Sequence, residues 1–384
     1  MKCNVPLLFI VLFMPFVCYA AGPAVKPSID MTDANNKSEE KTNVLPEDYY
    51  FNVESILPET DEDWKKFQFH GFFEVTSPVQ GRDDESQQPS SKFLDENELT
   101  FWVGKQITRR LSFDSEIEIT NGLQKYGLEK CEFDYEIFDK LLVFRVGKFK
   151  YPLGIERFVE DGPLNKLVDR PLLSIRVVPG TYSDIGGMIY GTLPVLNETK
   201  LKYEIAVSNG LEGPDPNDVQ QLWDNNSNKT LGGRIGYECL PGLEIGGSYS
   251  RGKYDEDNRL GIDFLGADIQ FKRGNLEMRG EYITGKVEQD PIDGGDYHRD
   301  GYYFQTSYKY PFNMSYLRYL EGVLRFDSVD PNRNITDGNE ANRIAFGMNY
   351  SPMEYLEFKL EYEIDNEPLV GVHGKSFVQA IFRW

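Results

Sequence analysis

The sequence predicts an all-β fold, a transmembrane antiparallel β-barrel of about 16 strands. The first observation is the C-terminal segment Gly374–Trp384, in which every second residue from Ser376 to the terminal Trp384 shares one side of an alternating pattern. Alternation with period two indicates a β-strand, and the aromatic terminus resembles the closing strand of outer-membrane barrels. Two further observations are the recurrence of similar segments and the alternation of short and long connections between them.

The N-terminal part of the chain has the features of an exported protein. Lys2 precedes an apolar run over residues 5–17 that ends at the small residues Ala20 and Ala21, which predicts a secretory signal peptide over residues 1–21. Residues 22–63 are acidic and polar without apolar periodicity, and they predict a flexible leader. We expect the barrel over residues 64–384 and place the protein in the bacterial outer membrane, after export through the cleaved signal.

Sixteen alternating segments of roughly 10 residues follow, a length that crosses a bilayer when the strand is tilted. In the segment from Leu111, apolar residues alternate with Asp114, Glu116 and Glu118, so the charged side must face water. The segments begin near residues 66, 94, 110, 129, 141, 183, 200, 230, 243, 261, 275, 300, 318, 342, 355 and 374. The count depends most on the poorly patterned stretch from Pro311 to Leu320.

The connections between these segments alternate in length, as in barrels with short periplasmic turns and long outer loops. A soluble β-sandwich has no reason for this alternation. With both chain ends in the periplasm, the number of strands must be even. The short connections lie at residues 107–109, 139–140, 240–242, 273–274 and 352–354, and the long ones at 77–93, 151–182, 210–229, 286–299 and 329–341.

Composition agrees with this fold class and limits the possible partners. Aromatic residues make up 14% of the chain and glycine is abundant with 35 residues, as expected for aromatic girdles and frequent chain reversals. The formal net charge of -21 argues against nucleic acid as a partner.

A barrel of this size normally encloses a water-filled channel, and the connection over residues 151–182 is long enough to fold inward as a constriction. The stretch 145–176 holds seven basic and four acidic residues, in contrast to the acidic chain as a whole. Lysine and arginine at a constriction favour anions. The same bases could instead cap strand ends or pair with nearby acids. The basic residues are Arg145, Lys148, Lys150, Arg157, Lys166, Arg170 and Arg176.

The order of several short motifs resembles the phosphate-selective porin O and P family. The resemblance extends from about Phe67 to the terminus and rests on residues 145–157 (RVGKFKYPLGIER), 183–191 (SDIGGMIYG), 207–210 (VSNG) and 266–268 (GAD). It implies a 16-stranded barrel, usually trimeric, that passes phosphate or other anions through a basic constriction.

The resemblance carries the family's basic constriction onto Arg145, Lys148, Lys150 and Arg157, with the remaining three bases of the loop as further candidates for anion contact. Arg234 and Arg325 have the parity of residues that line the wall. In an undisturbed strand, Arg145 and Lys148 face opposite sides. The expected partners are small hydrophilic solutes including phosphate, outer-membrane lipid and lipopolysaccharide, the barrel assembly machinery and two further copies of the chain, with no nucleic acid.

Two other transport or surface functions remain open. A cation- or sugar-permeable pore is the alternative if lumenal acids dominate, among them Glu96, Glu98, Asp114 and Glu116. A plugged barrel with a structural or adhesive role would use its acidic outer loops as the working surface.

The residues give little support to a catalyst or a metal site. His70 lies in the first predicted strand, and we expect His298 and His373 in outer loops, so the three histidines form no cluster. No Gly-x-Ser-x-Gly motif occurs either, and we expect no enzyme activity and no cofactor. The acidic outer loops suit solvated surface, and the run from Asp330 to Asn334 matches a calcium loop poorly, so we expect no metal. The mature chain keeps Cys131 and Cys239, whose pairing is left open.

Overall fold

The computed structural model describes residues 67–79, 96–120, 124–159, 162–180, 182–196, 199–219, 223–336 and 338–384. The predicted signal peptide and leader lie outside the described residues, as does most of the connection predicted at residues 77–93.

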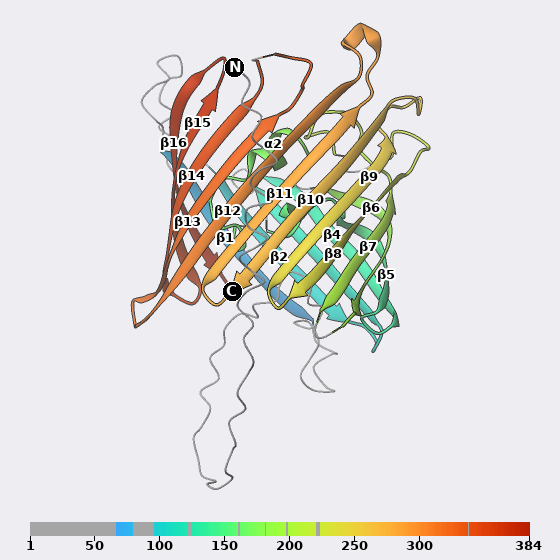
Figure 1. Ribbon diagram of the computed structural model, residues 1–384. Coiled ribbons are helices and arrows are strands. Elements are labelled where there is room, and N and C mark those ends of the chain that lie inside the picture. Colours follow the sequence, from blue (N-terminus) through green and yellow to red (C-terminus); the bar gives the residue numbers. More distant parts are fainter. Residues whose placement is uncertain are drawn as a thin grey trace. The chain divides into compact units, whose positions relative to one another are not determined.

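Within these ranges, 16 antiparallel strands form a closed barrel in which β1 pairs with both β2 and β16 (Figure 1). This confirms the predicted fold class. The strands are β1 Gln68–Val79, β2 Glu96–Gln106, β3 Leu111–Thr120, β4 Lys125–Phe138, β5 Leu142–Lys150, β6 Ser183–Pro194, β7 Lys200–Ser208, β8 Thr230–Leu240, β9 Leu243–Lys253, β10 Gly261–Arg273, β11 Leu276–Val287, β12 Tyr297–Met314, β13 Leu317–Asp330, β14 Ala341–Met353, β15 Leu356–Glu367 and β16 Gly371–Arg383.

In the described parts of the connections, the helical segments are η3 Glu156–Phe158, α2 Leu172–Arg176 and η4 Pro291–Asp293. No helix among the described residues has the length and apolar character to cross a membrane.

Alternation along the strands separates an apolar outer face from a mostly polar inner face. On β7, β8 and β10 the outward Ile205, Ile235 and Leu265 keep 48%, 58% and 59% of their surface exposed, which suits contact with lipid. The neighbouring inward residues Glu204 and Arg234 are buried and stand opposite each other in the β7–β8 register. The lumen is therefore lined by charges that the sequence alternation placed on the water-facing side.

The barrel closes at the C-terminus. Trp384 exchanges two backbone hydrogen bonds with Gly71, at 3.1 and 3.2 Å, and its ring meets Phe101 edge-on with centroids 5.8 Å apart. A Cβ on Gly71 would lie 2.7 Å from the Trp384 ring, so the closing strand requires glycine at this position.

The weakly alternating stretch from Pro311 to Leu320 contains the end of β12 and the start of β13. β12 continues through Pro311 to Met314 with a register shift against β13, because proline has no N–H for the ladder. The predicted outer-loop placement of two histidines is wrong: His298 lies in β12 and His373 in β16, because both strands begin before the residue at which the alternation starts. Cys131 in β4 and Cys239 in β8 are both free thiols.

Candidate functional site

The connection between β5 and β6 contacts inward-facing side chains of the barrel wall along two arms. Its first arm, residues 151–158, lies against β9 and β11. The N–H groups of Ile155 and Glu156 donate to the two carboxylate oxygens of Glu281 at 3.2 and 3.3 Å, and the Gly154 N–H donates to Ser248 Oγ at 3.2 Å. Gly154 has φ +71°, and a Cβ there would lie 1.5 Å from Glu281 Oε1, so only glycine fits this turn.

Arg157 follows on this arm and is buried. Its guanidinium forms an ion pair with Glu204 of β7 and donates to the carbonyls of Gly154 and Lys150, each at 3.2 Å. The side chains of Arg157 and Glu204 are only 4% and 5% exposed. Arg157 therefore holds the first arm against the wall at β7, and a passing solute has almost no access to its charge.

The second arm, residues 162–172, lies against β13, β14 and β15. Side chains from the wall bond to its backbone: Glu361 accepts from Val168 N at 2.5 Å and Asp169 N at 2.9 Å. Asp327 accepts from Leu172 N at 3.1 Å, and Arg325 donates to the carbonyls of Asp169 and Arg170 at 2.9 and 3.1 Å. Asn349 donates to the carbonyl of Lys166 at 2.9 Å. Lys359 donates to the carbonyl of Asn165 at 2.6 Å and to that of Gly162.

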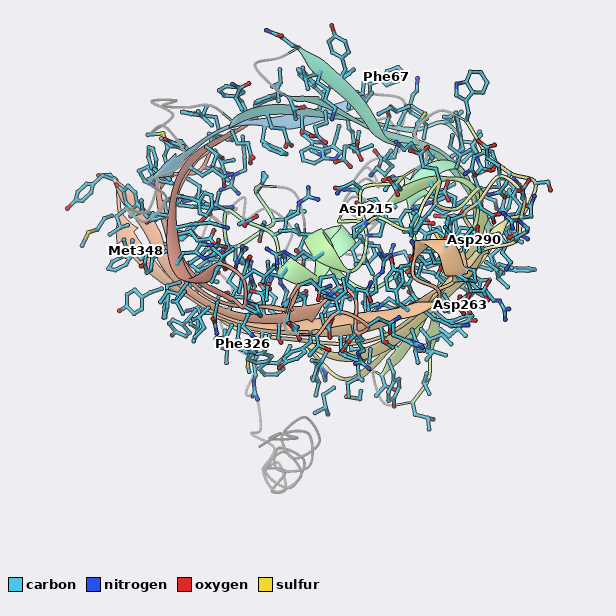
Figure 2. All side chains as sticks on the ribbon, turned by 90° about the horizontal axis from the view of Figure 1, so that it is seen from above. Phe67, Asp215, Asp263, Asp290, Phe326 and Met348 are labelled. Carbon is cyan, nitrogen blue, oxygen red and sulfur yellow. The ribbon has the colours of Figure 1, made fainter. Side chains whose placement is uncertain are left out.

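The second arm leads into α2, which packs on an apolar surface. α2 contacts β12 and β13, and Figure 2 shows its helical turn, in green, within the ring of strands. Leu172, Leu173 and Val177 join a buried apolar cluster with inward residues of the wall such as Phe264 and Ile283. Apolar side chains on the inner face of these strands thus provide a surface for the connection to cover.

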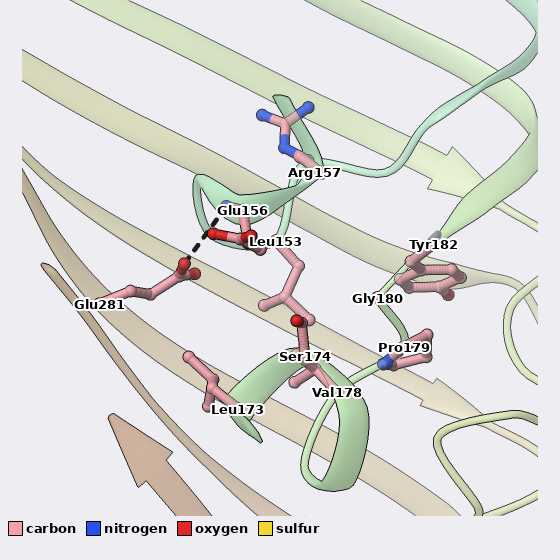
Figure 3. Close-up of a pocket in the computed structure, with 10 residues that line it drawn as sticks. All are labelled: Leu153, Glu156, Arg157, Leu173, Ser174, Val178, Pro179, Gly180, Tyr182 and Glu281. Carbon is pink, nitrogen blue, oxygen red and sulfur yellow. Dashed lines mark hydrogen bonds between the residues drawn. The ribbon is translucent and has the colours of Figure 1, made fainter. Parts of the chain in front are cut away.

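Figure 3 shows a small cavity between the first arm and α2, with β11 on the wall side. Leu153 and Glu156 of the first arm face Ser174 of α2, and Glu281 lies on the wall. Its volume is about 10 Å³, room for about one water molecule. This cavity is therefore too small for a solute, and it is no binding site for one.

Most of the predicted anion-contact residues stand against carboxylates. Arg145 forms a bidentate pair with Asp134 at 2.7 Å and a second contact with Glu132 at 3.0 Å. Gly147 separates Arg145 from Lys148 with φ +131°, so the strand between them is not regular. The other ion pairs are Lys150 with Glu116 at 3.6 Å, Lys166 with Glu321 at 3.2 Å, and Arg176 with Glu367 at 2.6 Å.

The seven bases differ in their access to solvent. The side chains of Arg145, Lys166 and Arg176 remain 18%, 17% and 31% exposed, in contrast to that of Arg157. Lys148 is buried in β5, and the backbone N–H of Arg170 donates to the Asp169 carboxylate.

Wall residues on distant strands have structural roles that sequence reasoning missed or left open. Arg234, predicted as a wall residue, is buried between Asp268 and Glu244, at 2.6 and 2.7 Å. Arg325, predicted in the same way, binds the second arm together with Lys359, which the sequence analysis did not select. The alternation of the sequence could place each of these side chains on the inner face, but it could not indicate which residue each one contacts.

A group of potential metal ligands occurs among the described residues at the outer end of β15 and β16, where ligand atoms of Asp365, Glu367 and His373 lie within 4.8 Å of one another. Both carboxylates already have cationic partners. Arg343 binds Asp365 at 2.7 Å and Arg176 binds Glu367 at 2.6 Å. A dication would have to displace these partners, so we assign no metal here.

Outside the strands, the connection between β11 and β12 contains an ordered acidic contact. Glu288 accepts from Lys253 Nζ at 3.0 Å and from Gly261 N at 2.8 Å, and these hydrogen bonds hold the pKa of its carboxyl below the usual value. This acidic loop residue is thus held within the protein's own contacts.

Comparison with known proteins gives one family and several structures of the same fold. Residues 66–367 match the family described as phosphate-selective porin O and P. An uncharacterized protein of Aquifex aeolicus (strain VF5) is 24% identical over 314 residues, which cover 71% of this chain and 70% of that protein.

Three solved structures illustrate the fold likeness. OmpF of Salmonella typhi, in complex with daunomycin, has a TM-score of 0.56 at 11% identity, covering 83% of this chain and 98% of that chain. The outer membrane channel DcaP of Acinetobacter baumannii has a TM-score of 0.51 at 10% identity, with 83% and 97% covered. OprB of Pseudomonas putida has a TM-score of 0.51 at 10% identity, with 83% and 94% covered.

Proposed function

Because the chain belongs to the phosphate-selective porin O and P family, we propose that it is an outer-membrane porin that passes small hydrophilic solutes by passive diffusion, with a weak preference for anions such as phosphate. The observation that carries the anion preference is the set of basic side chains that stay partly accessible on or beside the β5–β6 connection. These are Arg145, Lys150, Lys166 and Arg176, with side-chain exposures of 18%, 13%, 17% and 31%.

The preference is weak in this proposal because each of these bases has a carboxylate partner. Tight anion binding needs several donors that converge on one oxyanion, as in bidentate arginine contacts. Here Asp134, Glu116, Glu321 and Glu367 already neutralise much of the positive field. A solute anion loses part of its hydration shell, makes brief contacts with Lys166 or Arg145 in its place, and then moves on. The mechanism is passive and includes no chemical step.

A cation-permeable pore is the second candidate, and a specific observation favours it. Some carboxylates of the same region keep as much exposed surface as the bases: the side chain of Asp114 is 23% exposed and that of Asp169 is 29% exposed. With a formal net charge of -21, an excess of accessible carboxylates would attract cations into the channel.

Single-channel recording of the refolded protein in a planar bilayer under a tenfold potassium chloride gradient tests both candidates. Ideal selectivity for one monovalent ion gives a reversal potential of about 59 mV. We expect a stable conductance and a smaller potential with the sign of chloride preference. Lys166→Gln should move it toward cation preference, whereas Arg259→Gln, the same charge change in an outer loop, should have little effect.

The opposite sign in the unsubstituted protein would refute the anion preference and keep the porin. A folded barrel without conductance would favour a structural or adhesive function. The remaining expectations belong to the same proposal: a cleaved signal peptide, assembly by the barrel machinery, contact with lipopolysaccharide and a homotrimer. Crosslinking of the protein in intact outer membranes tests the trimer.

A further inference from the structure

The second arm of the β5–β6 connection has an unusual source of backbone hydrogen bonds. Residues 162–171 form turns and bends, so no helix or strand ladder provides their partners. Backbone N–H and C=O groups that are buried without partners destabilise a fold. Non-helical backbone at membrane depth therefore depends on partners from the surrounding protein.

Five wall side chains supply these partners, and we call them the loop clamp: Arg325, Asp327, Asn349, Lys359 and Glu361. The two cations donate to backbone carbonyls of the arm and the two carboxylates accept from its N–H groups, while Arg325 and Asp327 also pair with each other at 2.9 Å. Asn349 donates to the carbonyl of Lys166 at 2.9 Å. The sign of each wall charge thus matches the dipole end of the peptide group that it meets.

Burial separates the clamp from the solute. Arg325 and Asp327 have no exposed surface, Lys359 is 1% exposed and Glu361 is 4% exposed. Lys166, on the arm itself, keeps 17% of its side chain exposed. The clamp charges therefore face the loop, and the accessible charge of this region belongs to the segment that the clamp holds.

We propose that the loop clamp fixes the second arm at one distance from the wall and so sets the aperture of the channel, with Arg325, Lys359 and Glu361 acting as positioning residues that never touch the solute. The proposal rests on the porin function for its effect on conductance, but the hold on the backbone stands apart from any transport. Loss of one clamp residue lets the arm move, while the strands of the barrel keep their own ladders.

Two variants test the clamp. Lys359→Met removes both carbonyl contacts and keeps the length of the side chain, and Lys359→Arg should restore much of the hold. The matched control is Lys309→Met, an equal charge change at an inward-facing position of β12. The Lys309 Nζ lies 4.5 Å from the centroid of the Tyr319 ring. Asn349→Leu is the second variant, because it removes the bond to the Lys166 carbonyl and a longer one to Glu321, at 3.4 Å, without changing the charge of the lumen.

Hydrogen–deuterium exchange of the refolded barrel gives the first readout. Because hydrogen bonds to charged groups are among the stronger ones, we expect the peptide over residues 162–172 to exchange about tenfold faster or more in Lys359→Met, with unchanged exchange in the strands. Asn349→Leu should give a smaller increase at the same peptide. The second readout is single-channel recording, in which both variants should show larger current fluctuations and an altered conductance, while Lys309→Met should not.

Equal exchange at residues 162–172 in Lys359→Met and Lys309→Met would overturn the proposal, as would faster exchange spread over the whole barrel. If the unsubstituted protein does not conduct, the porin function fails, yet exchange still decides the clamp. If it conducts and the arm exchanges as in the control, the porin function stands and the clamp fails.

Discussion

Replacement of Arg157 by methionine should strongly destabilise the barrel with little effect on ion selectivity. Methionine keeps the length of the side chain but removes the partner of Glu204 and two donors to backbone carbonyls. Both side chains of the pair are about 95% buried, which leaves Glu204 as an uncompensated charge in the variant. Breaking a buried ion pair on one side costs about 3–5 kcal/mol.

The double variant Arg157→Met/Glu204→Met should recover most of that loss. An apolar pair of similar volume often matches a buried ion pair in stability, because the cost of desolvating two charges disappears with them. The comparison with the single variants isolates the interaction between the two positions. Equilibrium urea unfolding of the refolded barrel, followed by tryptophan fluorescence and by heat-modifiable migration, measures each step.

Arg176→Met is the matched control on the same connection. Its pair with Glu367 is more accessible, with side chains 31% and 19% exposed, so its loss should cost about 1 kcal/mol or less. A loss in Arg157→Met no larger than in Arg176→Met would refute the burial argument. A large change of the reversal potential in Arg157→Met would show that its charge reaches the solute.

Three more predictions concern other parts of the barrel. Gly154→Ala should destabilise the first arm by about 1 kcal/mol or more, from its left-handed φ and from the clash of the new Cβ with Glu281, and urea unfolding should detect this loss. Because the folded pKa of Glu288 is lowered, its contact with Lys253 should stabilise the loop above the unfolded pKa of about 4.3 and be lost as pH falls through the folded pKa. A loss of protection of the Gly261 amide at low pH, measured relative to its intrinsic exchange rate, would show this, and protection that is independent of pH would contradict it. Trp384→Ala should reduce the folded, heat-modifiable fraction, because the ring that closes the barrel is lost, and an unchanged folded yield would count against this role.

The barrel was largely predictable because each strand is encoded by its own residues. Predicted segments at residues 183, 200, 230, 243 and 261 coincide with the first residues of strands. At these points alternation begins directly after turn-forming residues, and the lipid-facing parity is strongly apolar. Local patterning was weaker around Pro311, where the register between β12 and β13 shifts.

The contacts of the predicted site were not predictable from local pattern, because they join segments far apart in the chain. Arg157 meets Glu204 across 47 residues, and Arg325 meets Asp169 across 156. Alternation indicates that a base faces inward, but only the path of the connection decides whether it meets water, a carboxylate or a carbonyl group. Arg145 and Arg157 were equivalent candidates in sequence, yet they differ in access because Arg145 lies on a strand and Arg157 lies in the connection, where it is buried against the wall.

The loop clamp also has a consequence for the order of folding events. Lys359 follows Gly162 by 197 residues, and Glu361 follows Asp169 by 192. The arm is synthesised long before the strands that hold it, and contacts at such separation form late because closing the intervening chain is entropically costly. Until β15 takes its place, the carbonyls of Gly162 and Asn165 and the N–H groups of Val168 and Asp169 lack these partners. The second arm therefore reaches its full set of contacts only after most of the wall has formed.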